Sequence, residues 1–295
     1  MKKSVLLIGD VMRDIIVKPE GELRIGSDQG AKIAMKPGGG AASQAIWLAA
    51  GQIETKLVAR VGSDDFFKLC ARFEKKNVKP VFTADPKRQT GILVSLIAKD
   101  GERSFYTDRG ANLALREEDI PQNILDGVGL VMLSGYSFFA PSPRAVVRGV
   151  MERASKLNIP VAIDPASYGF IKDVGVENFI EWTKGAAILL PNSQEAQLLS
   201  LGAETAGEQL QKLGQYYDQV ILKQGENGAC AIGNNGQIVK VKAPKIVAID
   251  TTGAGDAFAA GFIGATLSGL TLEKCLQAGV AQGSLASTRF GSQPA

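Results

Sequence analysis

Short apolar runs alternate with segments of helical character through the last two thirds of the chain, and this alternation restricts the folds it can adopt. The apolar runs occupy residues 128–133, 160–163, 187–190 and 220–222. The helical segments fall at about 142–157, 175–184, 193–200 and 206–216. Strands that alternate with helices form parallel sheets whose two faces the helices cover. The pattern therefore predicts an α/β fold around a mostly parallel central sheet.

The first third of the chain carries signals of antiparallel strands. Residues 31–36 alternate apolar and polar side chains, as a half-exposed strand does. Residues 91–98 and 104–107 flank Lys99-Asp100-Gly101-Glu102, in which the Asp-Gly pair favours a hairpin turn. These signals predict extra strands that pair outside the parallel sheet.

The remaining elements and the domain organisation are predicted from the same kind of pattern. Near the C-terminus we expect strands at 239–241 and 246–248, and helices at about 253–268 and 271–289. No linker, repeat or low-complexity segment divides the chain into independent parts. We therefore expect residues 1–295 to form a single domain, with the strands near 13–36 and 90–108 inserted into its body.

The chain of 295 residues contains no histidine, which excludes several kinds of active site. Ser-His-Asp and Cys-His catalysis, His-ligated metals and imidazole acid–base chemistry are all ruled out. Any proton transfer near neutral pH must therefore use a carboxylate, lysine, tyrosine, cysteine or water.

Charge, cysteine usage and hydropathy exclude further classes of protein. Lys and Arg total 33 against 30 Asp and Glu, a net charge of +3, and no basic cluster is interleaved with aromatic residues. We therefore expect no nucleic-acid partner. The 3 cysteines lie far apart and match neither a metal pattern nor a disulfide framework. Since no apolar run approaches the ~18 residues of a membrane span, we expect a cytoplasmic protein that does not bind membranes.

Residues 249–261 give the strongest local signal, because a strand end, a run of small residues and a helix start succeed one another there. Free backbone N–H groups at a helix start bind anions, and glycine lets an anion approach the chain closely. Asp256 would repel a phosphate ligand, but it suits a base that takes a proton from a hydroxyl while the amides hold a phosphoryl group. The alternative is that Asp256 merely stabilises the helix N-terminus electrostatically.

Residues 250–261, Asp-Thr-Thr-Gly-Ala-Gly-Asp-x-Phe-x-x-Gly, are similar to the C-terminal signature of the ribokinase (PfkB) family of carbohydrate kinases. Five more segments resemble motifs of that family in the family's order: the first strand with its sugar-binding acid at 9–14, the glycine motif at 37–45, the lid hairpin with its C-terminal extension at 90–112, the Asn-x-x-Glu motif at 191–196 and the nucleotide loop at 223–228. The resemblance implies a ribokinase-like three-layer αβα sandwich with a small β-strand lid. It also implies an ATP-dependent kinase that phosphorylates a hydroxymethyl group of a sugar or sugar-like molecule.

The resemblance implies a catalytic loop made of one carboxylate and three backbone amides. Asp256 would take the proton from the substrate's hydroxymethyl group. The amides of Gly253, Ala254 and Gly255 would hold the transferring phosphoryl group. Phosphoryl transfer depends on positioning, Mg²⁺ and charge stabilisation more than on covalent chemistry, so the lack of histidine is no obstacle.

The implied substrate site contains Asp14, Gly38, Gly39, Ser43 and Arg109. Asp14 would hydrogen-bond substrate hydroxyls, and the two glycines would let the sugar pack on the backbone. Ser43 stands where many members have an Asn, and its hydroxyl is shorter and offers one donor instead of two. The Arg109 guanidinium suits a carboxylate or phosphate, and the alternative is a solvated loop residue.

The resemblance also implies where the cofactors bind. Asn192 and Glu195 would organise the phosphates of Mg²⁺–ATP, Glu195 through water. Lys223, Gly225 and Gly228 belong to the implied nucleotide loop, and Gly225 would line the nucleotide site.

A K⁺ site is implied at the C-terminus, where residues 286–295 resemble the segment that helps to enclose a monovalent cation in ribokinases. Its oxygens would come from Asp250, Thr252, Ala286 and Gly291. A K⁺ beside the anion loop would reinforce the positive field there. The alternative is a tail that merely packs on the body.

Several alternatives stay open at this point. A nucleoside kinase on the same scaffold is favoured by the apolar segment 136–139 and by Ser43. A non-catalytic sugar-binding or regulatory protein is disfavoured by the intact 250–256 loop. A dinucleotide-dependent dehydrogenase is disfavoured because Phe258 occupies the third glycine position of GxGxxG. The lid strands also allow a homodimer, since exposed strand edges need covering. Which sugar, sugar acid or nucleoside is phosphorylated stays undetermined.

Overall fold

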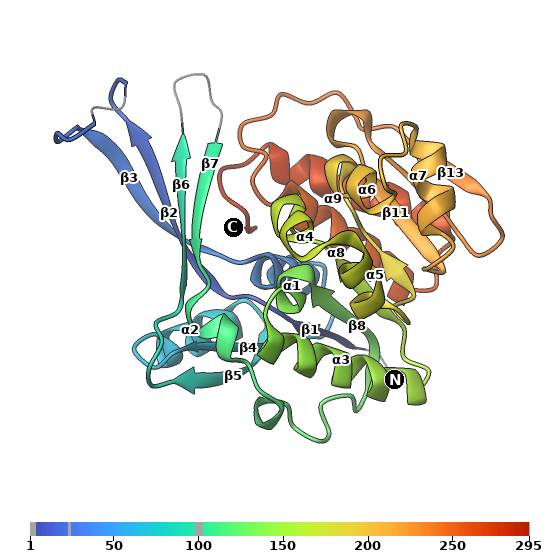
Figure 1. The fold of residues 1–295 in the computed structure, drawn as a ribbon, viewed down its shortest axis with the longest axis horizontal. Helices are drawn as coiled ribbons and strands as arrows, with labels where there is room; N and C mark the ends of the chain where they lie inside the picture. Colours follow the sequence, from blue (N-terminus) through green and yellow to red (C-terminus); the bar gives the residue numbers. More distant parts are fainter. Residues whose placement is uncertain (1–3, 23–24, 98–102, 295) are drawn as a thin grey trace.

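The computed structural model describes residues 4–22, 25–97 and 103–294, and within them a mostly parallel sheet of nine strands forms the body. The strands lie in the order β13-β12-β11-β10-β9-β8-β1-β4-β5 (Figure 1), and only β12 and β13 run antiparallel to their neighbours. Their bounds are β1 (Ser4–Ile8), β4 (Thr55–Gly62), β5 (Val78–Asp85), β8 (Val128–Ser134), β9 (Val161–Asp164), β10 (Ile188–Leu189), β11 (Gln219–Lys223), β12 (Ala229–Ile232) and β13 (Ile238–Val241).

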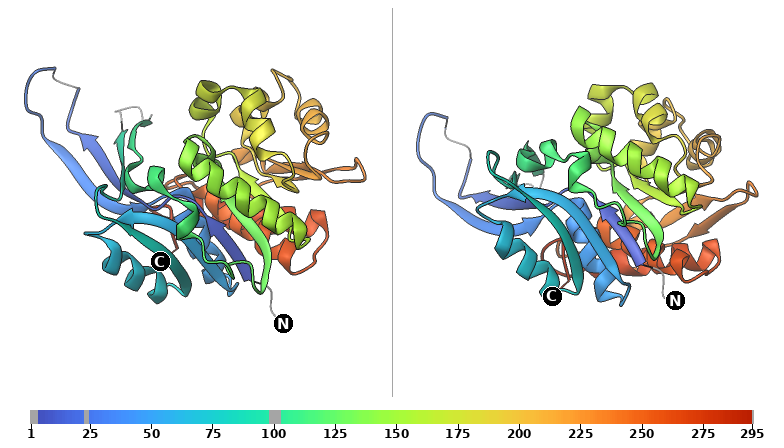
Figure 2. Two further views of the ribbon diagram at one scale, coloured as in Figure 1. Left: turned by 60° about the horizontal axis from the view of Figure 1, so that its bottom comes forward. Right: turned by 90° about the horizontal axis from the view of Figure 1, so that it is seen from below.

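Two layers of helices cover this large sheet, which gives the expected three-layer α/β architecture (Figure 2). One layer contains α1 (Gly40–Ala50), α2 (Phe66–Lys75), α8 (Ala254–Leu267) and α9 (Leu272–Ser287). The other contains α3 (Pro141–Lys156), α4 (Tyr168–Val174), α5 (Val176–Thr183), α6 (Ser193–Leu199) and α7 (Ala206–Leu213). Val5 and Leu7 of β1 join the core of the first layer, whereas Leu6 and Ile8 join that of the second. Because both faces of β1 are buried, its apolar run is unbroken.

Short 3₁₀ helices occupy several of the connections between these elements. They are η1 (Gly110–Ala114), η2 (Glu117–Asp119), η3 (Gly135–Phe138) and η4 (Gly225–Asn227).

A second sheet, called the small sheet here, projects from one side of the body (Figure 1). Its order is β3 (Ala31–Gly38), β2 (Met12–Pro19), β6 (Gly91–Ile97) and β7 (Arg103–Asp108). Asp14 pairs with Leu93, which pairs with Thr107, so these side chains share one face. The next row, which contains Ile15 and Tyr106, lies on the opposite face. The predicted hairpin turn at 99–102 lies outside the described residues.

The structure corrects one strand prediction and adds three elements. The strand predicted at 246–248 is wrong, because β13 pairs with β12 and the chain then continues without a strand. Pro244 has no N–H for a ladder, and Val247 is 86% exposed. The three added elements are β5, α4 and β12. Little in the sequence indicated β12, because two alanines and a cysteine among its four residues have weak strand propensity.

No helix in the described part of the chain is both long and apolar enough to span a membrane. The three cysteines are free thiols. The cytoplasmic location and the single-domain organisation stay predictions.

Candidate active site

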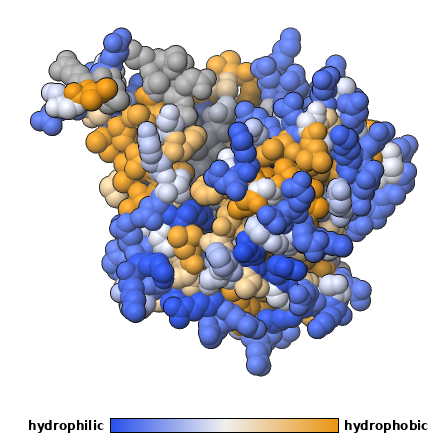
Figure 3. All heavy atoms as spheres, in the orientation of Figure 1, coloured by the Kyte–Doolittle hydropathy of each residue, from blue (hydrophilic) through white to orange (hydrophobic). Residues whose placement is uncertain are grey.

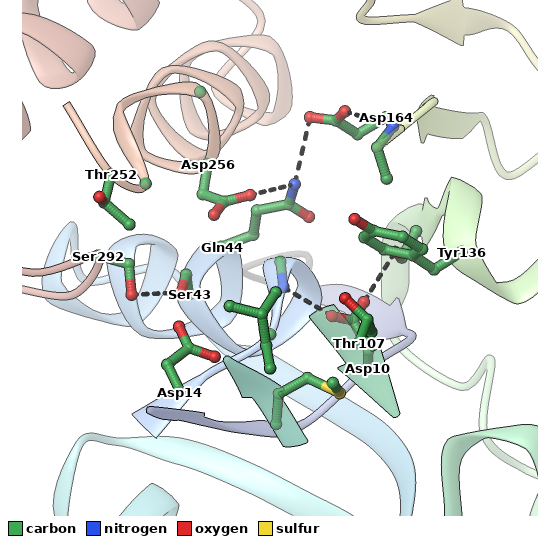
Figure 4. A pocket seen from close by; sticks show the side chains of 18 of the residues that line it. Asp10, Asp14, Ser43, Gln44, Thr107, Tyr136, Asp164, Thr252, Asp256 and Ser292 are labelled. Atoms are coloured by element: carbon green, nitrogen blue, oxygen red, sulfur yellow. Dashed lines mark hydrogen bonds between the residues drawn. The ribbon is translucent and has the colours of Figure 1, made fainter. Parts of the chain in front are cut away.

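A cavity of about 300 Å³ opens where the carboxyl ends of β1, β8, β9 and β11 meet the small sheet and the first turns of α1 and α8. Open parallel sheets bind ligands at this edge. Figure 4 shows side chains from both sheets around the cavity. The predicted site residues that line it are Asp14, Gly39, Ser43, Arg109, Asn192, Glu195, Lys223, Thr252, Gly253, Gly255 and Asp256.

The start of α8 forms one wall of the cavity. Its N-cap is Gly253, with a φ of 76° and no side-chain cap, and a Cβ there would lie 2.6 Å from Ser292. Both the positive φ and the close approach require glycine. Of the three predicted amides, that of Ala254 donates to the Thr251 carbonyl at 3.2 Å, and Ala254 is not among the lining residues. Gly253 and Gly255 do line the cavity.

Asp256 lies in the first turn of α8, and its Oδ1 accepts a hydrogen bond from Gln44 Nε2 at 3.1 Å. Burial raises its pKa well above the ordinary value, and the nearby carboxylates of Asp164 and Asp10 raise it further. The Lys223 ammonium and the Gln44 amide act in the opposite direction. The group is therefore a carboxylate with a strong affinity for a proton.

Lys223, at the end of β11, supplies a positive charge to the floor of the cavity. Its Nζ donates to Asp164 Oδ2 at 2.8 Å, and its side chain is 12% exposed. Burial alone would lower the pKa of Lys223, but the carboxylates of Asp164, Glu195 and Asp256 raise it on balance. The lysine is therefore fully charged at neutral pH.

Asn192 and Glu195 form a reciprocal cap at the start of α6. Asn192 Oδ1 accepts from the Glu195 N–H at 2.9 Å, and Glu195 Oε2 accepts from the Asn192 N–H at 2.9 Å. A parallel bridge holds Asn192 beside Lys223. Burial raises the pKa of Glu195 to about 7, and Asp164 adds to the effect against the opposing Lys223 charge.

The side of the cavity where the sequence predicts the substrate contains Asp14 on β2 and the glycines before α1. Burial, and after it the charge of Asp10, raises the pKa of Asp14 to about 6. A Cβ on Gly38 would overlap the Asp14 carboxyl, although Gly38 itself does not line the cavity. Gly39 has a φ of 97° and packs on the Asp10 carbonyl, so it too must be glycine.

Arg109 points into the cavity, and the alternative of a solvated loop residue is wrong. Its side chain is only 11% exposed, with Nη1 4.0 Å from Asp10 Oδ2 and the guanidinium 4.1 Å from the centre of the Tyr136 ring. Asp10 also accepts from the Gly40 N–H and the Ser134 hydroxyl, each at 2.8 Å. The guanidinium thus lies on an aromatic wall beside a fixed carboxylate.

Residues after α9 fold back onto the loop before α8. Asp250 accepts backbone N–H groups from Thr252 and Gly291, each at 3.0 Å, so three predicted cation ligands lie together. The fourth, Ala286, has a carbonyl that accepts from the Arg289 N–H at 3.1 Å. The Ser43 hydroxyl donates to Ser292 Oγ at 3.2 Å.

Seven predicted residues, all within the described ranges, stand outside the cavity lining: Gly38, Gly225, Gly228, Asp250, Ala254, Ala286 and Gly291. Gly225 lies in η4, next to the end of β11. Gly228 has a φ of 91° and packs on the Val241 carbonyl, so it has a structural role where the start of β12 lies beside the end of β13.

A model of the pfkB family of carbohydrate kinases matches residues 2–295. The chain belongs to this family. A relative described as an uncharacterized sugar kinase, from Archaeoglobus fulgidus, is 30% identical over 228 residues, which are 76% of this chain and 87% of the relative. The ribokinase of Haemophilus influenzae is 26% identical over 310 residues, covering 99% of this chain and 95% of its own.

The structural comparison agrees with the family assignment. A structure of Arabidopsis thaliana ribokinase complexed with ribose and ATP superposes with a TM-score of 0.83 at 25% identity, covering 100% of this chain and 96% of the other. The fold is ribokinase-like, as the sequence motifs implied. As a PfkB carbohydrate kinase the protein is a phosphotransferase with an alcohol group as acceptor.

Sequence reasoning assigned no role to several polar residues that line the site of this PfkB kinase. Asp10, Ser134 and Asp164 each end or follow an apolar run, so the rule that ligands bind at the carboxyl ends of parallel strands could have found them. Gln44 is a polar residue within a run of small apolar residues, and this pattern could also have indicated a functional role. In the structure its side chain is buried in α1. Ser292 gave no comparable signal.

The oxygen-bearing side chains of the cavity fit an Mg²⁺ ion that is bound together with the phosphates of a nucleotide. Among the described residues no group of three or more Cys, Asp or Glu could by itself hold a metal. The lining nevertheless has five carboxylates against two cations: Asp10, Asp14, Asp164, Glu195 and Asp256 face Lys223 and Arg109. Mg²⁺ is usually bound through one or two carboxylates together with substrate phosphates rather than in a protein cage.

Proposed function

We propose that the protein transfers the γ-phosphate of ATP to a hydroxymethyl group of a sugar or sugar-like molecule, with Asp256 as the base. One observation carries this proposal: a carboxylate of raised pKa stands in the first turn of a glycine-capped helix at the floor of the cavity. The N–H groups of Gly253 and Gly255, which line the cavity, attract the phosphoryl group, and the carboxylate accepts the proton that the acceptor hydroxyl loses.

The nucleotide side of the proposal rests on Asn192, Glu195 and Lys223. The Lys223 ammonium lies 3.7 Å from the position of a Cβ on Gly255, so it faces the anion loop and can neutralise phosphate charge. An unaccompanied triphosphate would be repelled by the surrounding carboxylates, so ATP should bind with a divalent cation. Mg²⁺ would supply charge neutralisation there, with Asn192 and Glu195 as its protein contacts. K⁺ at Asp250, Thr252, Ala286 and Gly291 would strengthen the field of the loop.

Asp256→Asn tests the base. The amide keeps the shape of the side chain but accepts no proton, so we expect kcat to fall by about 10²–10⁴-fold while ATP still binds. The exposed Asp218→Asn serves as the control and should leave kcat unchanged. Near-normal turnover of Asp256→Asn would refute the mechanism. Transfer above background in the parent protein would exclude a non-catalytic sugar-binding role.

A nucleoside kinase is the second candidate, and a second cavity favours it. This cavity, of about 340 Å³, shares Leu93, Thr107 and Tyr136 with the first. Phe105 and Phe170 complete its aromatic lining, and Phe170 stacks on Phe139 with ring centres 5.3 Å apart. A planar base attached to the acceptor sugar would fit such aromatic walls.

A screen with Mg²⁺–ATP separates the substrate classes. The acceptors are ribose, fructose, 2-keto-3-deoxygluconate, adenosine and pseudouridine, each with and without K⁺. We expect Arg109→Ala to raise KM for the acidic sugar alone and Phe170→Ala to raise KM for nucleosides alone. A loss with neutral nucleosides in Arg109→Ala would count against a carboxylate-binding role.

The face of the small sheet opposite the cavity supports a homodimer. Ile33, Met35 and Tyr106 on this face are 65–70% exposed, and hydrophobic atoms gather along the sheet in Figure 3. Pairing two copies through this face would cover it. A monomeric mass in light scattering would refute this arrangement.

A further inference from the structure

Gln44 lies in α1, where its side chain is 2% exposed among small apolar neighbours. Its Nε2 donates to Asp256 Oδ1 at 3.1 Å and to Asp164 Oδ2 at 3.3 Å (Figure 4). Its Oε1 is buried and has no hydrogen-bond partner among the described residues. A buried acceptor without a partner is unfavourable, so this amide is not arranged for stability alone.

The two hydrogen bonds fix the geometry of the proposed base. Because both N–H groups of Nε2 are engaged, the amide cannot flip without losing both bonds. Asp256 Oδ1 is occupied by this donor, which leaves Oδ2 to take a proton from the acceptor. Asp164 is held in turn by Lys223, so a hydrogen-bonded chain connects Lys223, Asp164, Gln44 and Asp256.

The amide also separates two carboxylates. Without it, Asp164 and Asp256 would face each other across the floor of the cavity, and like charges favour protonation of one of the pair. We infer that Gln44 is a positioning residue for phosphoryl transfer, which holds Asp256 with Oδ2 toward the acceptor and keeps its carboxylate from sharing a proton with Asp164. This inference rests on the proposed role of Asp256 as the base.

The expected pH dependence of the activity follows from the groups that shift the pKa of Asp256. Burial has the largest effect and raises the pKa of Asp256; Asp164 at the end of β9 and Asp10 after β1 raise it further. Lys223 at the end of β11 lowers it, and so does the hydrogen bond from Gln44 on α1. Removing the Gln44 donor should therefore raise the pKa of Asp256 above its value in the parent protein.

Gln44→Met tests the inference, because methionine has a similar length and no donor. At pH 7 we expect kcat to fall by about 10–100-fold, with KM for the best of the five screened acceptors and Kd for Mg²⁺–ATP both within about threefold. The loss should shrink at higher pH, because the acid limb of the kcat/KM profile moves to higher pH when the pKa of Asp256 rises. Gln44→Glu should move the limb further, since it adds another carboxylate beside Asp256.

The matched control is Gln209→Met, which removes the amide of another buried glutamine, 7% exposed in α7, that donates to the Ala203 carbonyl at 2.9 Å. It should change stability without moving the pH profile. An unshifted acid limb in Gln44→Met, or a loss of equal size at every pH, would overturn the inference.

A second measurement needs no acceptor. The carboxyl ¹³C shift of Asp256, identified by its absence in Asp256→Asn, should titrate at a higher pH in Gln44→Met than in the parent. An unchanged midpoint overturns the inference whatever the activity. If instead the midpoint moves but Asp256→Asn retains near-normal turnover, the proposed base fails while the contact between Gln44 and Asp256 stands.

Discussion

Two helices, α6 and α8, begin at the edge of the same cavity with an acidic residue in the first turn, but they use that residue differently. In α6 the Glu195 carboxylate turns back to accept the Asn192 N–H, while the Asn192 side chain accepts the Glu195 N–H. In α8 the N-cap is Gly253, which has no side chain, and Asp256 bonds to Gln44 of another helix instead. The acid of α6 completes its own helix, whereas the acid of α8 does not cap its helix and, in our proposal, acts as the base.

The difference teaches what makes a helix start available to a ligand. A side-chain cap satisfies N–H groups that would otherwise attract an anion. A glycine cap offers these N–H groups no side-chain acceptor and lets the chain approach a ligand closely. The α6 start therefore suits a supporting role beside phosphates, and the α8 start suits the transferring group.

Gly253→Ala, which alters the start of α8, should have the largest effect on activity. The added Cβ combines a φ of 76° with a position 2.6 Å from Ser292, so the loop before α8 must move. We expect kcat to fall by about 10²-fold or more, as when an anion-binding amide is displaced. Steady-state kinetics measures the effect.

The control for Gly253→Ala is Gly269→Ala, just after α8, where φ is 73° but a Cβ would meet nothing within 4 Å. It carries the backbone penalty alone and should leave kcat unchanged. Equal kcat values for the two variants would show that close packing at Gly253 does not shape the site.

Asn192→Ala should have the next largest effect. It removes the cap of α6, which should lower the free energy of unfolding by about 1 kcal/mol, and it should raise KM for ATP several-fold. Thr205→Ala on α7 is a matched control, because Thr205 and Glu208 form the same reciprocal cap away from the cavity. Urea unfolding should give similar losses for both variants, and an ATP effect shared by both would contradict the special position of α6.

Features that depend on neighbouring residues could be predicted from the sequence, and those that depend on distant ones could not. The start of α8 was predictable because its glycines, its acid and the helix start are close neighbours in the sequence, and the alternation of strands and helices predicted the large sheet. The strand end expected before this loop is absent, since the last strand of the described chain, β13, ends at Val241. The hydrogen-bond partner of Asp256 was not predictable, because Gln44 is 212 residues away in the sequence and reaches Asp256 only when α1 and α8 pack together.

The error at 246–248 has the same origin. Apolar side chains at Ile246 and Val247 resemble a strand locally, but a strand needs a partner, and β13 finds its partner in β12. The family motifs predicted many of the residues that line the cavity, Arg109 among them. The surroundings of Arg109 could not be predicted, since only the fold brings Asp10 and Tyr136 around its guanidinium.

The smallest effect we predict concerns how pH acts on the two capping acids, Glu195 and Glu208, without divalent cation. The pKa of Glu195 is raised from 4.5 to about 7, so the folded state binds the proton more tightly and stability falls as pH rises from about 4.5 to 7. Glu195→Gln should flatten this decline, measured as the urea midpoint between pH 4 and 8. Glu208 is fully exposed and its cap lowers its pKa, so its contribution is instead lost as pH falls below 4.5. Slopes of the same sign for Glu195→Gln and Glu208→Gln would show that burial beside Asp164 and Lys223 does not distinguish the two caps.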